Sequence, residues 1–245
     1  MKKQTIDKIP ARLDLIQSVT GLALALFMWA HMFFVSTILL GKDVMYNVTK
    51  FFEGYYFFGE SYPIIVTIAA GTIFIIFIAH AAVAMRKLPS NYKQFMIMKN
   101  HVATFDHGDT RFWFWQVFTG FAMLFLGSIH LYIIMTHSAD IGPYASADRV
   151  VSEWMWPLYI LLLLAVELHG SIGMYRLALK WGWFEGKDAK KSRVKLRRYK
   201  YAITIFFLTL GFITLAAYIK IGIEHKDHAG ERYMEQKSVV KGVAL

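Results

Sequence analysis

Five long apolar segments constrain the fold of this chain more than any other feature of its sequence. A helix needs about 20 mostly apolar residues to cross a membrane. A mean hydropathy of +0.41 agrees with a membrane protein rather than an ordinary soluble domain. We therefore predict an all-α, integral membrane five-helix bundle that forms a single domain over residues 1–245. Its predicted spans are about 14–40, 63–87, 112–137, 151–179 and 199–222.

The basic residues lie between these segments. The formal net charge is +10, which alone could indicate a nucleic-acid partner. Most of the lysines and arginines, however, fall in the N-terminal stretch, the second loop and the fourth loop, a distribution typical of charges that orient a membrane protein. The positive-inside rule therefore predicts a cytoplasmic N-terminus and a periplasmic C-terminus, with lipid rather than nucleic acid as the partner.

Four histidines lie inside the apolar segments, one in each of the first four: His31, His80, His130 and His169. An ionisable residue within a spanning helix is rare and usually functional. Four interhelical hydrogen bonds are the simpler alternative, but four such residues, one per helix, favour a metal or cofactor site. The chain has no cysteine, which excludes disulfides, iron–sulfur clusters and thiolate sites within it.

The depth of each histidine sorts the four into pairs. At 1.5 Å per residue, His31 and His130 lie roughly 14 Å and 10 Å from the outer ends of their helices, and His80 and His169 roughly 26 Å and 27 Å. Two bis-histidine sites follow, roughly 15 Å apart in depth. Zinc favours four tetrahedral ligands, whereas two facing imidazoles in apolar surroundings suit six-coordinate haem iron. We therefore expect two haems b, ligated by His31 with His130 and by His80 with His169, that transfer electrons.

A repeated spacing accompanies the histidines. Thr20 precedes His31 by 11 residues, as Thr119 precedes His130, and a glycine follows each threonine. Gly21 and Gly120 therefore lie roughly 15 Å inward of their histidines, at the other level. Glycine there suits the close approach of a flat macrocycle and, equally, close packing of two helices.

With these features in place, several strings resemble a known family: HMFFVSTILLG (31–41), AHAAVAMRK (79–87), GSIHLYIIMT (127–136), VSEWMWPLY (151–159) and VELHGSIGMYRLALKWGWF (166–184). They look like the dihaem cytochrome b membrane-anchor subunit of quinol:fumarate reductases, within the succinate:quinone oxidoreductase family. The form is the single-subunit type of epsilon-class bacteria. The resemblance covers nearly the whole chain and is poor after about residue 223.

The resemblance implies a function. The subunit would lie in the bacterial inner membrane and anchor a flavoprotein subunit and an iron–sulfur subunit on the cytoplasmic side. Menaquinol would be oxidised near the outer haem, and electrons would pass through both haems to the partners, where fumarate becomes succinate in anaerobic respiration. The complex would be a dimer of heterotrimers. Two alternatives stay open: a succinate:quinone reductase working in the reverse direction, and a transporter or structural bundle without haem.

Two acids gain expected roles from the resemblance. Glu53 stands in the first outer loop, where the family has its quinol-site glutamate, although a solvated loop acid is the simpler interpretation of the sequence alone. Glu167 lies within the fourth span, two residues before His169, where a carboxylate is costly. The family uses a glutamate there, with a haem propionate, to carry protons as electrons cross.

Propionate partners complete the expected site. By depth, Gln17, Ser18, Trp113 and Lys180 are candidates at the inner haem, and Arg149 at the outer haem. His107 has a family counterpart with no role assigned. The basic loop from Lys187 to Lys200 could contact anionic lipid or the iron–sulfur subunit, and the sequence does not separate these readings.

Overall fold

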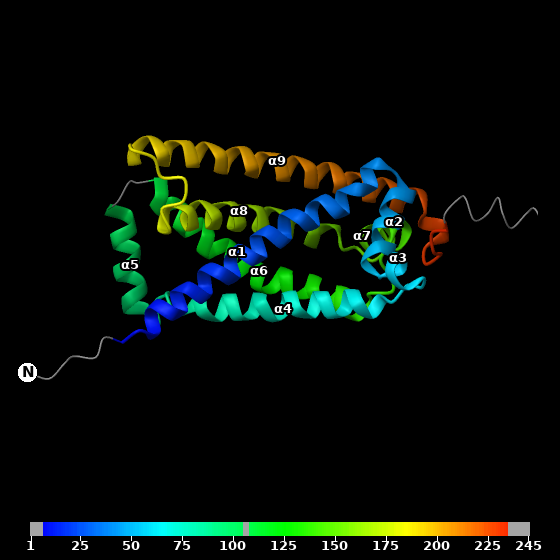
Figure 1. The fold of residues 1–245 in the computed structure, drawn as a ribbon, viewed down its shortest axis with the longest axis horizontal. Coiled ribbons are helices and arrows are strands. Elements are labelled where there is room, and N and C mark those ends of the chain that lie inside the picture. The colour runs from blue at the N-terminus through cyan, green and yellow to red at the C-terminus, as the bar shows by residue number, and fades with distance from the viewer. Residues whose placement is uncertain (1–6, 105–107, 235–245) are drawn as a thin grey trace, which may run out of the picture.

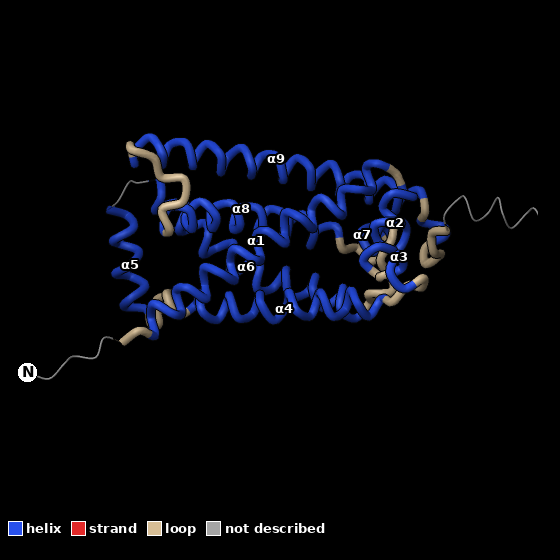
Figure 2. Tube along the Cα trace, in the orientation of Figure 1, coloured by secondary structure: helices blue, strands red, loops and turns tan. Residues whose placement is uncertain are grey.

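The structure is a computed structural model that describes residues 7–104 and 108–234, and within these residues it holds helices and no strand. Five long helices run side by side along the molecule (Figures 1 and 2). Each is long and apolar enough to cross a membrane, so the prediction of a five-span helical bundle is confirmed. The spanning helices are α1 (Ile9–Ser36), α4 (Pro63–Met85), α6 (Gly108–Thr136), α8 (Trp156–Lys180) and α9 (Ala189–Glu224).

Short helices cover the two ends of the bundle. Helix α5 (Tyr92–Thr104) runs across one end, which we call the inner end (Figure 1). The opposite, outer end carries η1 (Thr37–Leu40), α2 (Lys42–Phe52), α3 (Tyr55–Phe58), α7 (Pro143–Val151) and η2 (Lys226–His228). Helix α1 begins at the inner end and η2 lies at the outer end, as an odd number of spans requires.

The outer surface of the spanning helices is apolar. Ile75, Phe125 and Ile205 are 72%, 68% and 64% exposed, and they belong to three different spans. Soluble monomers do not expose apolar surface on this scale, whereas a helix facing acyl chains must. The chain is therefore a multi-pass membrane protein.

The fourth span differs from its predicted bounds. Helix α7 ends at Val151, Trp154 adopts a φ of 56°, and α8 begins only at Trp156. Pro157 explains the break, because proline lacks an amide donor and its ring clashes with the carbonyl four residues earlier in a continuous helix. His169 therefore lies 13 residues into α8, or roughly 20 Å rather than 27 Å from its outer end.

The fifth span also differs, at its inner end. Most of the basic segment expected as a loop from Lys187 is helical, because α9 begins at Ala189. Asp188 caps this helix, since its side chain accepts a hydrogen bond from the backbone N–H of Lys191 at 3.0 Å. The basic residues therefore extend α9 beyond its apolar stretch instead of forming an irregular connection.

Polar and small residues hold α9 against the bundle. Ser36 of α1 and Thr214 of α9 share a buried hydrogen bond of 2.8 Å. A Cβ on Gly222 would lie 2.6 Å from the carbonyl oxygen of Ala147 in α7. These contacts are typical of spanning helices, where apolar burial does not drive association and close packing does.

Candidate functional site

The structure brings the four intramembrane histidines together in two facing pairs. The ring centroids of His31 and His130 are 6.2 Å apart, and those of His80 and His169 are 6.4 Å apart. These are the pairs that the depth argument gives. Two imidazoles bound to opposite sides of one metal ion, at about 2 Å each, have centroids about 6 Å apart. The spacing of both pairs therefore fits bis-histidine ligation of a haem iron.

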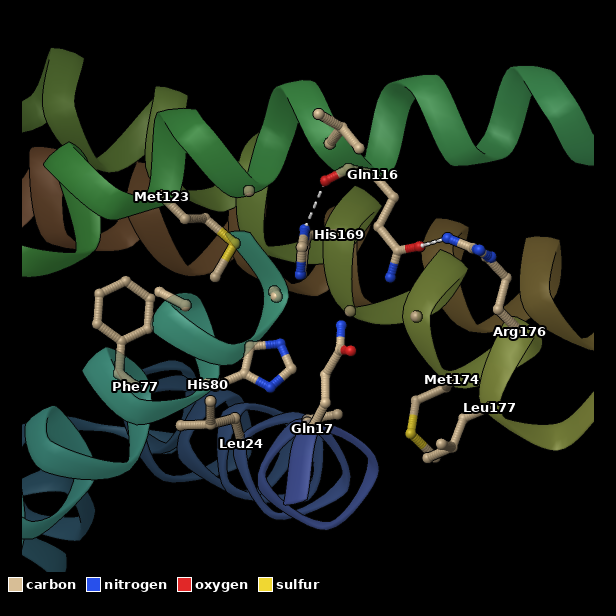
Figure 3. A pocket seen from close by; sticks show the side chains of 18 of the residues that line it. Gln17, Leu24, Phe77, His80, Gln116, Met123, His169, Met174, Arg176 and Leu177 are labelled. Carbon is tan, nitrogen blue, oxygen red and sulfur yellow. Dashed lines mark hydrogen bonds between the residues drawn. The ribbon is translucent and has the colours of Figure 1, made fainter. Parts of the chain in front are cut away.

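Hydrogen bonds fix the orientation of the inner pair. His169 Nδ1 lies 2.9 Å from the backbone oxygen of Gln116 in α6 (Figure 3), so that nitrogen must carry the proton. His80 Nδ1 lies 3.0 Å from Thr20 Oγ1, whose own proton is directed to the carbonyl of Ile16 at 2.7 Å. Both rings thus keep Nε2 as the free lone-pair nitrogen, which is the ligand form of histidine.

A cavity of about 460 Å³ surrounds the inner pair, as Figure 3 shows in part. Its size is that of a pocket for a large organic ligand, and its walls are mainly apolar. The four inner propionate candidates all line it: Gln17, Ser18, Trp113 and Lys180. The residues present therefore fit a haem at this level.

Glycine shapes the wall of the same cavity. A Cβ on Gly21 would lie 2.9 Å from His80 Cε1, and one on Gly120 would lie 3.0 Å from His169 Cε1. Any side chain at these two positions would push against the imidazole. In both helices, the glycine after the threonine thus leaves room for the ring of an inner histidine. This is a further reason for glycine, beside the approach of a macrocycle and the close packing of two helices.

Cations gather at the inner mouth of the cavity. Asp14 of α1 contacts Arg86 at 2.7 Å and Lys87 at 2.6 Å through Oδ1, and Lys180 at 2.8 Å through Oδ2. Lys180 also donates to Ser18 Oγ at 3.2 Å. One carboxylate here faces three cations, so the mouth has positive charge available for the carboxylates of a ligand.

The outer pair has different surroundings. Among the described residues, His130 Nδ1 is buried without a hydrogen-bond partner, and the ring packs edge-on against Tyr159 at 5.7 Å. Arg149 is 5% exposed, contacts Tyr159, and donates to the backbone oxygen of Asp140 at 2.8 Å. The structure therefore places Arg149 beside the outer pair, where a propionate partner is expected.

The two candidate acids are both buried but have different partners. Glu53 is 2% exposed and its Oε2 lies 2.6 Å from Lys50 Nζ, so it is not the solvated loop acid of the simpler interpretation. Glu167 is 0% exposed, and within the described part of the chain neither of its oxygens has a hydrogen bond of good geometry. Trp29 of α1 directs its indole toward Glu167.

Several of these neighbours were not expected from the sequence. Thr20 was noted only for its spacing, and the Gln116 carbonyl gives no sequence signal because any residue supplies one. Lys50 could have been found from its i,i+3 relation to Glu53 on a helix. Asp14 could have been found as an acid at the start of an apolar span. His107 lies outside the described residues.

Comparisons with known proteins agree with this geometry. Residues 91–216 match the family described as succinate dehydrogenase/fumarate reductase transmembrane subunit. The fumarate reductase cytochrome b subunit of Wolinella succinogenes is 55% identical over 221 residues, which are 90% of this chain and 86% of that protein. The subunit of the same name from Helicobacter pylori strain J99 is 52% identical over 220 residues, covering 90% and 85%. This chain therefore belongs to the family of succinate dehydrogenase and fumarate reductase transmembrane subunits.

Proposed function

We propose that this chain is the dihaem cytochrome b anchor of a menaquinol:fumarate reductase, and that it hosts quinol oxidation at its outer end. The relatives at 55% and 52% identity are named as fumarate reductase cytochrome b subunits. The observation that carries the proposal is that the histidines form two facing pairs, with ring centroids 6.2 and 6.4 Å apart. A flavoprotein subunit and an iron–sulfur subunit at the inner end, on the cytoplasmic side, would complete the enzyme, as a dimer of heterotrimers.

The chain's own residues define what each haem site provides. His31 with His130, and His80 with His169, would hold one haem b each, and a haem ligated on both sides supplies one-electron transfer without binding oxygen. Thr20 and the Gln116 carbonyl keep the inner imidazoles in the ligating tautomer. The wall of the cavity around the inner pair is mainly apolar.

Two acids would handle the protons of quinol oxidation. Glu53, at the C-terminal end of α2, would accept a proton from a quinol hydroxyl, and its contact with Lys50 at 2.6 Å would hold the carboxylate in one orientation. Glu167 is enclosed between the helices near the middle of α8, next to the indole of Trp29. It would hold a proton in transit, because a carboxyl group whose oxygens have no hydrogen-bond partner among the described residues can take up a proton and release it.

Haem content tests the proposal most directly. We expect two haems b per chain in the purified complex, measured as the pyridine haemochrome against protein, with a b-type band in the reduced-minus-oxidised spectrum. His130→Ala and His169→Ala should each retain one haem. His137→Ala is the matched control, because His137 is exposed at the outer end of α6 and should leave two. One haem in the unmodified protein, or none, would overturn the two-site arrangement.

Quinol turnover tests the outer acid. Glu53→Gln should abolish fumarate reduction by a menaquinol analogue while leaving fumarate reduction by a reduced viologen dye, which donates to the partner subunits. Glu60→Gln, an exposed acid of the same loop, is the control and should keep both activities. Rates with succinate and oxidised quinone decide the physiological direction. Normal menaquinol turnover in Glu53→Gln would refute the role of this acid.

A further inference from the structure

The segment that follows α9 folds back over the outer end instead of leaving it. His225, the first residue after α9, is buried, and its Nδ1 lies 3.0 Å from Asp148 Oδ1 in α7. The other oxygen of Asp148 accepts a hydrogen bond from the backbone N–H of Gly230 at 3.0 Å. A buried carboxylate with two such bonds fixes the path of the segment, because breaking either leaves a buried charge unsatisfied.

Aromatic contacts continue this anchor toward α2. The ring of Tyr144 in α7 stacks on His225, with centroids 3.9 Å apart and planes 14° from parallel. The ring of Tyr233 also contacts Tyr144, edge-on, with centroids 5.2 Å apart. Lys42, the first residue of α2, lies 4.9 Å from the Tyr144 centroid and donates to its hydroxyl at 3.4 Å. Helix α7 and residues 225–233 therefore contact each other and together hold the start of α2 in place.

Tyr233 makes the contact that reaches furthest along α2. Its hydroxyl donates a hydrogen bond to Asp43 in the first turn of α2. Its ring packs against Tyr46 one turn later, at 5.7 Å. The ammonium group of Lys50 lies 5.3 Å from the Tyr46 centroid, and the same group bonds Glu53 at 2.6 Å. A continuous series of contacts thus joins Tyr233 to the buried acid.

Helix α2 needs such support. It has 11 residues, and a helix of that length is marginal without tertiary contacts. Its buried side chains on the bundle side are Met45 and Thr49. On the face that bears Asp43 and Tyr46, the contacts come from Tyr233.

We propose that residues 225–233 act as a clasp that positions the Lys50–Glu53 pair for quinol oxidation, with Tyr233 as the positioning residue. The inference rests on the proposed role of Glu53. The clasp does not touch the quinol. It fixes α2, and through Tyr46 it limits the orientations that Lys50 can adopt while paired with Glu53. A base held in one orientation transfers a proton efficiently, whereas a misplacement of about 1 Å can cost up to about a hundredfold in rate.

The test compares two variants of Tyr233 in the intact complex. Tyr233→Phe removes the hydroxyl bond to Asp43 and keeps the ring on Tyr46, while Tyr233→Ala removes both contacts. We expect kcat for menaquinol-driven fumarate reduction to fall about three- to tenfold in Tyr233→Phe and about ten- to a hundredfold in Tyr233→Ala, with KM within about twofold. Viologen-driven fumarate reduction and haem content should be unchanged in both. Met234→Ala, which changes an exposed neighbour, should leave kcat unchanged.

A double-mutant cycle identifies the hydroxyl contact. Asp43→Ala, which removes the acceptor of the Tyr233 hydroxyl, should lower kcat about as much as Tyr233→Phe, and the double variant should be no slower than either. Additive losses would overturn the clasp. So would wild-type kcat in Tyr233→Ala, even if its thermal stability falls, because the segment would then be structural only.

Glu53→Gln separates the clasp from the proposed role of Glu53 in quinol oxidation. If Glu53→Gln lacks quinol turnover and the Tyr233 variants turn over normally, the clasp is wrong and the role of Glu53 stands. If Glu53→Gln itself turns over normally, the proposed quinol-site acid is wrong and the clasp falls with it. If Glu53→Gln and the Tyr233 variants all turn over menaquinol slowly, the role of Glu53 and the clasp are both supported.

Discussion

Thr20 and Thr119 occupy equivalent places in α1 and α6, and of the two it is Thr20 for which the described residues show a hydrogen bond to a histidine. Each hydroxyl bonds the carbonyl four residues earlier, at 2.7 Å for Thr20 and 2.6 Å for Thr119. Thr20 also lies 3.0 Å from His80 Nδ1. Thr20→Val therefore removes a hydrogen bond from a candidate haem ligand. Thr119 cannot serve as its control, because the Thr119 hydroxyl lies 3.3 Å from the Gln116 carbonyl that also binds His169 Nδ1. Thr72→Val is the matched control, because the hydroxyl of the exposed Thr72 in α4 bonds the Ile68 carbonyl at 2.9 Å in the same way.

The magnitude follows from the burial of this contact. A hydrogen bond between neutral groups contributes about 0.5–1.5 kcal/mol, and a buried donor left unsatisfied costs about 1–3 kcal/mol. Donation from Nδ1–H makes an imidazole a stronger ligand and favours oxidised iron. A tenfold change in an equilibrium constant corresponds to about 1.4 kcal/mol, and in a one-electron couple it corresponds to about 59 mV. A loss of about 1 kcal/mol in the oxidised state therefore shifts the midpoint potential by about 40 mV.

We therefore expect Thr20→Val to raise the midpoint potential of the inner haem by roughly 20–60 mV and to leave the outer haem unchanged. The assay is a spectroelectrochemical titration of the purified complex, with the two haems assigned by comparison with His130→Ala and His169→Ala. Thr72→Val should change neither potential. An equal shift in both threonine variants, or a shift confined to the outer haem, would refute the assigned hydrogen bond.

Further outcomes follow from the buried acid, the charged mouth and the close contact of α9. Glu167→Gln should keep both haems in the spectrum and lose menaquinol turnover, and wild-type turnover would contradict its role in proton transfer. Asp14→Asn should leave three cations at the inner mouth without their carboxylate, so haem should remain bound while thermal stability falls more at low salt than at high salt. Gly222→Ala should lower stability by about 1–3 kcal/mol, because the added Cβ meets the Ala147 oxygen at 2.6 Å; an unchanged melting temperature of the complex would contradict that contact.

The number of spans and the pairing of histidines could be predicted because both depend on local chemistry. A run of about 20 apolar residues has few alternatives to a spanning helix. Counting along straight helices then sets the depth of each histidine to within a turn or two. The count for His169 was too large by five residues because Pro157 separates α7 from α8, yet the two levels were far enough apart for the pairing to be unaffected.

The contacts between side chains could not be predicted in the same way. Helix phase and depth place a residue near a neighbour, but they do not say which rotamer it adopts. Lys50 and Tyr233 are far apart in the sequence, and the fold of the segment after α9 links them through Tyr46. That segment resembles the family poorly, so neither the sequence pattern nor the resemblance indicated that it returns to the outer end.

The spacing of 11 residues between threonine and histidine makes α1 and α6 members of both sites at once. Eleven residues are about three helical turns and about 16 Å, and they return a side chain to within about 20° of the same face. Each of these helices thus carries a histidine of the outer pair and, about three turns away, a threonine and a glycine at the level of the inner pair. One residue inserted between the threonine and the histidine would rotate one site by about 100° against the other, so both pairs of histidines constrain this spacing at the same time.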